Sequence, residues 1–565
     1  MWEVLTLLVF MIFFVLYGTT PILGGAGLGL VGADEPRYAQ IAHEMLVKLT
    51  QAHTLREKLS ACVTPYLYGK PWLEKPALYY WRAMYAFGEF GVHDWVARLP
   101  SVSFALWLVG LTYLHMRRFR RGGHLDAALI TAACVGILSF SRGASTDMQL
   151  AAPFSIGMLG WYAWYETRSK FWLVDIYFFT AIATLAKGPV APFLVLVIVG
   201  SFAVLRREWW IFTKSIWWPG IALYFAIVLP WFIAVQHQNP TFFREFFLEH
   251  NLERFATNRY QHHQPWYYYL VVLVLALMPW TVFAIRALVD ALQISIAEWK
   301  VRSQPQRYLG YQRAGDAFPE FLVLWAILPV IFFSFSQSKL PGYILPALPP
   351  ITILTGDYLY RIRNSGTPRW LLWTHACTAG FITFVILLCP TYMMVERIWL
   401  PTRAVLLAAI AAGIFVAGIL VIVAKYGAGK VRMVTCIGVA ASVLFLMSNV
   451  HFSVLGYRVA LQNGPLLDLN YSARPLARLI QKAAPDVRTV AVYKVRRDME
   501  YGLAFYRDQP LLNYELNGVP QQEHILVVRN TDAGDLDQVL AGRAYRQLFF
   551  YPWQGLNVYL VSAHP

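Results

Sequence analysis

Apolar runs of the length that a transmembrane helix needs, about 17–25 residues, recur along the chain from its start to about residue 453. Thirteen of them are predicted to be membrane spans, including a retained first span at the N-terminus that lacks the basic start and cleavage site of a signal peptide. The predicted spans cover residues 4–21, 99–116, 126–140, 150–165, 172–186, 189–204, 217–236, 266–288, 321–335, 343–360, 370–389, 401–424 and 432–453.

The loops between these runs alternate in their content of lysine and arginine. Loops that are poor in both residues cover 141–149, 336–342 and the stretch near 390–400. The positive-inside rule places the basic loops in the cytoplasm, with the N-terminus on the same side. The basic loops cover 117–124, 166–170, 206–214, 290–320, 361–369 and 425–432.

Thirteen spans place the last segment, 454–565, on the non-cytoplasmic side. Its pattern differs from that of the spans, because apolar and polar residues alternate at 489–495 and 524–530 and a helical pattern occupies 473–484. Alternation with a period of two is typical of strands. We therefore predict a transmembrane domain over residues 1–453 and a small extracytoplasmic α/β domain over 454–565.

Two further segments on the non-cytoplasmic side are long and polar, residues 22–98 and 237–265. The first contains two amphipathic helical patterns, at 35–49 and 75–91, with Trp and Tyr on one side. Such helices are typical of the plane of the membrane interface. The chain is thus predicted to be a polytopic helical membrane protein with interfacial helices in its first outer loop.

Composition supports a membrane protein and excludes several other classes. Of the 565 residues, 58% are hydrophobic and 14% are charged, whereas soluble domains carry about 25% charged residues. The net charge of +16 is spread over short loops and forms no single stripe, so we predict no nucleic-acid partner. The five cysteines show no CxxC spacing and indicate neither a disulfide framework nor a zinc motif.

Asp34 and Glu35 begin the first interfacial helix, in the sequence ADEPRYAQI. The structural interpretation is a helix N-cap at Asp34, followed by Glu35 and Pro36 in the first turn. The functional interpretation is a carboxylate held at the boundary between water and lipid, which is compatible with capping.

Three further motifs bring charged groups to the same side of the membrane. Glu74–Lys75 precedes an aromatic helix and fits either an interfacial anchor or a metal ligand beside a phosphate-binding cation. Asp147 fits a helix start, and Lys187 lies in a predicted turn between two apolar runs, where a lysine in the membrane would be costly. Lys339 occupies a similar place, with Tyr343 one turn later.

The segment 249–269 is rich in histidine, with His250, His262 and His263 near two arginines, Arg254 and Arg259. Histidine and glutamate are zinc ligands. A divalent metal, with zinc favoured, held by Glu74 and one or more of these histidines is one hypothesis, and the other is a polar loop without metal.

No catalytic serine–histidine–acid arrangement, glycine-rich phosphate loop or Walker motif occurs, which disfavours an ATP-driven pump. The absence of paired interrupted helices weakens a secondary transporter. Polar residues gather at one end of the spans, which favours chemistry at one membrane face. A lipid-linked flippase and a non-catalytic receptor stay as alternatives.

Together the motifs GADEPRYAQIAHEML, LEKPALYYW, GASTDMQL, AKGPVAP, EHNLERF, QHHQPWYYY and SKLPGYILPALPP resemble those of one family. This is the 4-amino-4-deoxy-L-arabinose transferase branch of the protein-O-mannosyltransferase-like superfamily. The motifs cover about residues 1–350, and the C-terminal domain resembles the family only weakly. The resemblance implies a GT-C fold with about thirteen spans, and a monomer in the bacterial inner membrane with its active site in the periplasm.

The resemblance also implies an activity: transfer of a sugar, 4-amino-4-deoxy-L-arabinose, from undecaprenyl phosphate to lipid A. It implies catalytic roles for Asp34 and for Asp147, which it places near the acceptor or the sugar. The metal ligands would be Glu74 with His250 or His262. The cations and hydroxyl that would bind the carrier phosphate are Arg37, Lys75, Arg259, Lys339 and Tyr343.

A departing lipid phosphate is an anion, so these cations would stabilise charge that develops in the transition state. A hydroxyl acceptor needs a general base, which suits Asp34, whereas a phosphate acceptor with a second pKa of about 6 is already ionised. The presence of Asp34 therefore does not identify the acceptor. The alternatives are another polyprenyl-phosphate sugar, such as mannose, and a protein Ser/Thr or envelope-glycan acceptor.

Overall fold

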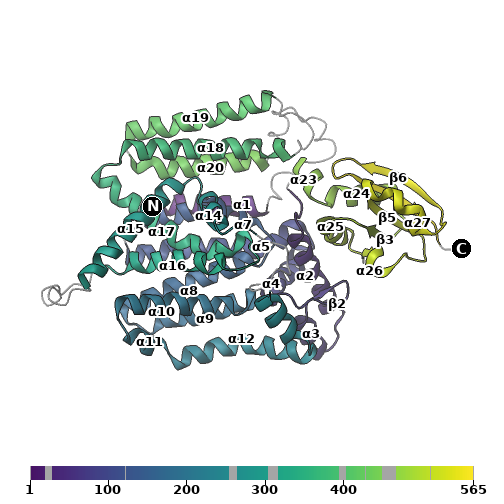
Figure 1. Cartoon of the computed structure of the whole chain (residues 1–565), viewed down its shortest axis with the longest axis horizontal. Coiled ribbons are helices and arrows are strands. Elements are labelled where there is room, and N and C mark those ends of the chain that lie inside the picture. The colour runs from purple at the N-terminus through teal and green to yellow at the C-terminus, as the bar shows by residue number, and fades with distance from the viewer. Residues whose placement is uncertain are drawn as a thin grey trace.

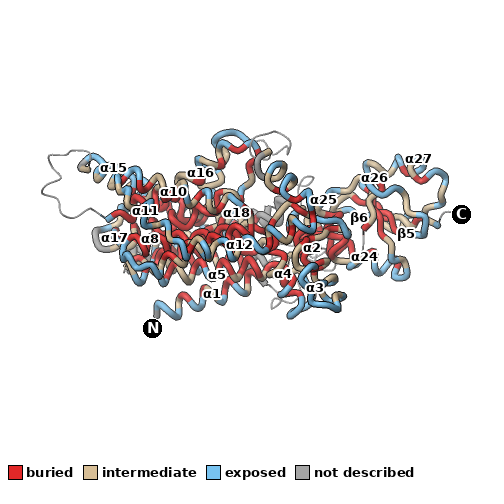
Figure 2. Tube along the Cα trace, turned by 90° about the horizontal axis from the view of Figure 1, so that it is seen from below, coloured by how far each residue is buried: buried red, intermediate tan, exposed pale blue. Residues whose placement is uncertain are grey.

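The structure is a computed structural model of the chain. It describes residues 2–19, 28–120, 122–253, 264–302, 316–393, 402–426, 428–447, 466–509 and 511–563. Figure 1 shows a helical body, in which most helices run side by side, and a C-terminal unit at one end of it. Figure 2 shows that the buried residues gather along the middle of the helical body and inside the C-terminal unit.

Each of the thirteen predicted spans falls on one helix or on consecutive helices, as far as the described residues extend. Long apolar stretches form these helices because no water is present in a bilayer to satisfy backbone groups. The helices are α1 Trp2–Thr19, α5 Asp94–Phe119, α6 His124–Ala133, α7 Val135–Arg142, α8 Asp147–Thr167, α9 Phe171–Lys187, α10 Val190–Arg206, α11 Trp210–Ser215, α12 Trp218–Gln238, η2 Arg244–Glu253, α14 Tyr268–Ala276, α15 Thr281–Arg302, α16 Phe318–Ser334, η4 Pro341–Ala347, α17 Leu348–Ser365, α18 Arg369–Met393, α19 Thr402–Tyr426, η5 Ala428–Lys430 and α20 Val431–Met447.

By length and composition, three helices in the described residues are long and apolar enough to cross a membrane, namely Asp94–Phe119, Trp218–Gln238 and the Arg369–Leu388 part of α18. Two bent pairs raise that number to five if each pair is counted as one span. Several other helices are apolar but shorter. The chain is therefore a multi-pass helical membrane protein by its apolar helices, and the number thirteen stays a prediction.

The predicted span over 266–288 is not one straight helix. Helices α14 and α15 meet there at 114°, and Pro279 lies between them. Proline lacks the N–H that continues a helix. The predicted span 126–140 is likewise bent, by 59° between α6 and α7.

The segments predicted to be cytoplasmic gather at one end of the helical body. Arg120 forms ion pairs with Glu166 and with Asp316, the latter at 2.9 Å. His124 lies 3.2 Å from Glu3 of the N-terminal helix. These contacts join three of the basic segments and the N-terminus, as the loop charges predict.

Asp126 strengthens the same end. Its carboxylate, which is only 2% exposed, accepts from Arg363 at 2.8 Å and from Arg432 at 2.7 Å. These two ion pairs join α6 to α17 and α20, so they fix the C-terminal helices of the helical body to its N-terminal part.

At the opposite end lies the first outer loop, which folds into three helices and a short antiparallel hairpin (Figure 1). The predicted helix 35–49 is α2. The predicted helix 75–91 begins three residues later, as α4, because residues before a proline avoid the helical region and Lys75 precedes Pro76. The elements are α2 Asp34–Gln51, α3 Leu55–Val63, β1 Tyr66–Leu67, β2 Lys70–Pro71 and α4 Leu78–Phe90.

The C-terminal unit, residues 466–563, contains a five-stranded sheet with strand order β4-β3-β5-β7-β6. The patterns at 489–495 and 524–530 correspond to β3 and β5, which pair in parallel. Side chains alternate along β3, so Val490 faces α24 and α25, and Ala491 faces α26 and α27. The elements are α23 Leu466–Tyr471, α24 Arg474–Ala483, β3 Val490–Tyr493, α25 Arg497–Arg507, β4 Leu511–Asn513, α26 Tyr514–Asn517, β5 His524–Arg529, η6 Asn530–Asp535, α27 Leu536–Leu540, β6 Tyr545–Tyr551 and β7 Leu556–Val561.

Candidate functional site

The two acids that open α2 have different surroundings. Asp34 is the first helical residue and its carboxylate is 55% exposed, bonded to Arg37 one turn later at 2.5 Å. The expected N-cap at Asp34 is wrong, because Ala33 is the N-cap and no side chain caps the helix. The Asp34 carboxylate is thus left on the surface of the site, in contact with a cation.

Arg37 joins Asp34 to the second predicted acid. Its Nη1 lies 3.6 Å from Glu74 Oε2, and its Nη2 bonds Asp34. Glu74 in turn lies 3.9 Å from Lys75 Nζ. The structure therefore brings four of the sequence-predicted residues into one cluster of two carboxylates and two cations, namely Asp34, Glu74, Arg37 and Lys75.

Aromatic rings surround Arg37. Its guanidinium lies 5.0 Å from the rings of Tyr38 and Trp72, and 5.9 Å from that of Tyr501 in the C-terminal unit. Burial opposes the charge, but Tyr38 and the carboxylates of Glu74 and Asp34 outweigh it and raise the pKa of Arg37 above its ordinary value. The guanidinium is a fixed cation, and one buried atom, Nε, has no hydrogen-bond partner.

A second cluster lies at the adjoining ends of α8 and α9. Lys187 Nζ donates to Asp147 Oδ1 at 2.5 Å, and Ser145 Oγ donates to Asp147 Oδ2 at 3.1 Å. The positive charge of Lys75 in the first cluster also acts electrostatically on Asp147, so the two clusters interact through their charges. Lys187, which the sequence placed in a turn, is the last residue of α9 and is followed by Gly188 at positive φ.

Tyr343 and Gly342 complete this cluster from η4. The ring of Tyr343 lies 5.1 Å from Lys187 Nζ. A Cβ on Gly342 would lie 2.5 Å from Asp147 Oδ1, so only glycine permits the acid to approach this backbone. The structure therefore places Asp147, Lys187 and Tyr343 together.

Lys339 is buried and donates to the backbone oxygen of Gln264 at 3.2 Å. Its ammonium group therefore connects the segment before η4 to the segment before α14. Its expected role at a carrier phosphate stays a prediction.

The structure describes only some of the residues of the predicted metal site. His250 lies in η2, whereas His262 and Arg259 lie outside the described residues. Among the residues that the structure describes, no group of three His, Cys, Asp or Glu side chains could hold a metal ion. The Glu74 carboxylate already faces Arg37 and Lys75, so the described residues alone do not form a zinc site.

Sequence reasoning missed the role of Glu35. Its carboxylate lies 2.8 Å from Arg98 Nη2, and it accepts from the N–H groups of Val31 and Ala144, both at 2.9 Å. The signal was present as an arginine, Arg98, inside the first turns of an apolar helix, where an unpaired charge would be costly.

Helix α25 is more than ordinary surface of the C-terminal unit, because its Tyr501 and Phe505 pack in one apolar cluster with α2 and α4. The hydrophobic face of α25 gave no indication of its partner, which is far away in the sequence.

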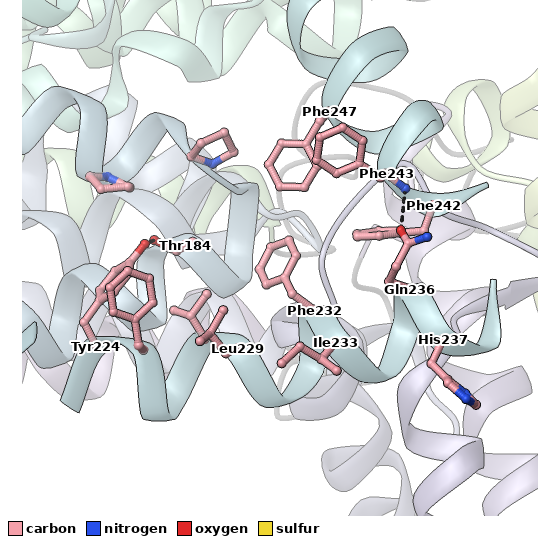
Figure 3. Close-up of a pocket in the computed structure, with 14 residues that line it drawn as sticks. Thr184, Tyr224, Leu229, Phe232, Ile233, Gln236, His237, Phe242, Phe243 and Phe247 are labelled. Carbon is pink, nitrogen blue, oxygen red and sulfur yellow. Dashed lines mark hydrogen bonds between the residues drawn. The ribbon is translucent and has the colours of Figure 1, made fainter. Parts of the chain in front are cut away.

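An apolar cavity of about 610 Å³ lies between α9, α12 and η2 (Figure 3). Phe232, Phe242 and Phe247 line it. Its polar groups include Gln236, which accepts from the N–H of Phe243 at 2.9 Å. Thr184 and Pro189, which flank Lys187 in the chain, also line it, so the cavity lies beside the second cluster.

Comparisons with known proteins show which family and which solved structures this chain is similar to. The family described as dolichyl-phosphate-mannose-protein mannosyltransferase matches residues 74–233. A protein from Pseudomonas paraeruginosa named undecaprenyl phosphate-alpha-4-amino-4-deoxy-L-arabinose arabinosyl transferase is 30% identical over 60% of this chain and 57% of its own length. One of the same name from Erwinia tasmaniensis is 27% identical over 64% of this chain and 60% of its own length. The matches thus span about three fifths of these relatives.

A crystal structure of ArnT from Cupriavidus metallidurans, bound to undecaprenyl phosphate, matches the whole chain. Its TM-score is 0.73 with 20% sequence identity, covering 100% of this chain and 99% of that one. This chain has the GT-C membrane fold of that protein. The resemblance to aminoarabinose transferases predicted from the sequence is confirmed.

Proposed function

We propose that this chain is a membrane glycosyltransferase that moves 4-amino-4-deoxy-L-arabinose from undecaprenyl phosphate to a phosphate of lipid A. The observation that carries the proposal is the pair of charge clusters around Asp34 and Asp147, joined through Lys75, at one end of a GT-C helical body. The named relatives and the carrier in the related crystal structure support this donor.

The proposed setting is the inner membrane of a bacterium, which the chain crosses thirteen times as a monomer. The basic segments joined by Arg120 would lie in the cytoplasm. The site and the C-terminal α/β unit, at the other end of the body (Figure 1), would then lie in the periplasm.

In the proposed reaction, the bond between the sugar C1 and the carrier phosphate oxygen breaks, and an acceptor oxygen bonds to C1. The departing phosphate keeps the electron pair, so cations beside it lower the barrier. Lys75 and Lys187 are cations that the two clusters supply for this role, with Tyr343 as a hydroxyl donor. An ionised lipid A phosphate needs no base, so Asp34 would orient the acceptor or balance positive charge on the sugar.

A metal held by Glu74 and a histidine stays a prediction. Such a metal would supply further positive charge at the leaving phosphate. The steps above are assigned to the chain's own side chains alone.

The apolar cavity in Figure 3 is proposed to hold the first isoprene units of the carrier. Five phenylalanines line it, and it adjoins the C-terminal end of α9, which carries Lys187. A polyprenyl phosphate needs this combination of a long apolar surface next to a cation.

The match to mannosyltransferases over 74–233 favours one second candidate, in which the same site transfers another polyprenyl-phosphate sugar to a protein Ser/Thr or an envelope glycan. In that reaction Asp34 would act as the general base for a hydroxyl.

Purified protein with undecaprenyl-phosphate aminoarabinose and lipid A tests the proposal. We expect transfer to lipid A, no transfer from undecaprenyl-phosphate mannose to a peptide, and loss of transfer with Asp34→Asn. Transfer only to a hydroxyl acceptor would favour the second candidate. No transfer to either acceptor by well-folded protein would contradict both.

A further inference from the structure

The backbone immediately before Asp34 is held by the C-terminal unit. The N–H of Gly29 donates to Asp468 Oδ1 at 2.8 Å, and the N–H of Leu30 donates to Tyr506 Oη at 2.7 Å. Asp468 lies in α23 and Tyr506 in α25. Two residues more than 400 positions away in the chain therefore bind consecutive backbone groups of the segment 28–33.

Residues 28–33 form no helix or strand, so other contacts must satisfy their backbone groups. Arg98 of α5 donates to the carbonyl oxygens of Leu28 and Gly29, each at 2.7 Å. Val31 donates to Glu35. The segment is thus fixed between α5 and the C-terminal unit.

Gly29 shows how close this contact is. A Cβ at that position would lie 2.7 Å from Tyr506 Oη and 2.8 Å from Asp468 Oδ1, and it would also overlap Ser472. No larger residue fits without separating the segment from the C-terminal unit.

A network of charges holds Tyr506 and Asp468 themselves. Tyr506 Oη donates to Asp94 Oδ2 at 3.3 Å. Arg474 lies 2.7 Å from Asp94 and 2.7 Å from Asp468. Because Asp94 is the first residue of α5, the network ties the C-terminal unit to the helical body at the point where the segment passes.

The same helix of the C-terminal unit also reaches the cation that binds Asp34. Tyr501 lies five residues before Tyr506 on α25, and its ring lies 5.9 Å from the guanidinium of Arg37. Helix α25 therefore touches both the backbone that leads into Asp34 and the partner of its carboxylate.

We propose that Asp468 and Tyr506 are positioning residues, through which the C-terminal unit holds the segment 28–33 and so sets the place of Asp34 and Arg37 in the site. The inference rests on the proposed function for its effect on turnover, but the geometry that it describes is independent of the substrate. It assigns the C-terminal unit a direct part in the reaction site.

The test compares two tyrosines of the C-terminal unit. Tyr506→Phe removes the hydroxyl that binds Leu30, and Tyr514→Phe removes a hydroxyl that binds His524 inside the unit at 2.5 Å. We expect Tyr506→Phe to lower kcat about tenfold, because the free energy of one lost hydrogen bond corresponds to about a tenfold change in rate. Its KM for the donor should stay unchanged, and Tyr514→Phe should keep the wild-type kcat.

A second readout needs no turnover. Hydrogen exchange of peptides covering residues 28–38 should become faster in Tyr506→Phe and stay unchanged in Tyr514→Phe. Equal exchange in both variants would overturn the inference, whatever the activity. If exchange is faster in Tyr506→Phe but the wild-type protein transfers no aminoarabinose, the contact with segment 28–33 is supported and only the proposed function is contradicted.

Combined variants separate positioning from folding. The trace of transfer that Asp34→Asn retains should not fall further when Tyr506→Phe is added, because both changes act on one group. Gly29→Ala should lower kcat like Tyr506→Phe, and Gly534→Ala, where a Cβ meets nothing within 4 Å, should not. Full additivity, or a loss equal in Gly534→Ala, would contradict the proposal.

Discussion

Asp34 and Glu35 are neighbours in the chain, yet their carboxylates serve different partners. Glu35 bonds the buried guanidinium of Arg98 at 2.8 Å, whereas Asp34 is 55% exposed and contacts Arg37. One acid is committed to holding the fold of the first loop. The other remains accessible for the reaction.

This difference predicts that one isosteric substitution affects stability and the other affects transfer. Glu35→Gln leaves Arg98, 2% exposed, without its counter-charge, and breaking such a pair costs about 3–5 kcal/mol. We expect a clearly lower thermal midpoint in detergent for Glu35→Gln. Asp34→Asn should keep the wild-type midpoint and lose transfer, and an unstable Asp34→Asn would show that the assignment of the two acids is wrong.

The ion pair between Lys187 and Asp147 should behave as one unit. Lys187→Met and Asp147→Asn should each lower stability, and the double variant should lose less than the sum, by an interaction energy of about 0.5–3 kcal/mol. Thermal unfolding of all four proteins measures this.

Transfer gives the second half of that experiment. All three variants should transfer poorly, because both side chains belong to the proposed site. Strictly additive losses of stability would show that the two side chains do not interact. Full turnover in the double variant would show that the ion pair has no part in the reaction.

Gly342 predicts a packing effect at the same acid. Gly342→Ala places a Cβ 2.5 Å from Asp147 Oδ1 and 2.9 Å from the ring of Phe140, so the carboxylate must move. We expect a fall in kcat of at least about tenfold, the equivalent of 1.4 kcal/mol. Gly110→Ala, which meets nothing within 4 Å, is the matched control, and equal kinetics in both variants would refute the close approach.

His524 predicts a pH dependence of the C-terminal unit. Burial lowers its pKa below 6.5, although the bond to the Gln522 carbonyl opposes this. Its other ring nitrogen faces Tyr514. Because the folded pKa is below the unfolded value, the unfolded state binds more protons as the pH falls below 6.5, so stability is lost in that direction.

Thermal unfolding at pH 7.5 and pH 5.5 checks this prediction. The wild-type midpoint of the C-terminal unit should fall at the lower pH, and that of His524→Gln should change less. An identical pH response in the two proteins would assign the effect to other groups.

The sequence predicted most of the helices because long apolar runs leave the backbone few alternatives to helix in a bilayer. It placed the basic segments at one end correctly, as Arg120 and Asp126 show. It failed at the bend between α14 and α15, where an apolar run continues through Pro279 and hydrophobicity alone gives no sign of direction.

For the site, the family resemblance and the predicted membrane face implied that Asp34, Arg37, Glu74 and Lys75 serve one site, and the structure brings them together. Neither could predict Tyr501 beside Arg37, because that contact depends on how two distant segments dock. Long-range docking leaves no periodic signal in the chain.

The most direct measurement of the central claim is a mass spectrum of envelope lipids from a bacterial host that lacks its own aminoarabinose transferase. The host would carry this chain, its Asp34→Asn variant or an empty vector. We predict that lipid A gains the mass of one aminopentose with this chain only. Unmodified lipid A in cells that contain well-folded protein and the undecaprenyl-phosphate donor would contradict the claim.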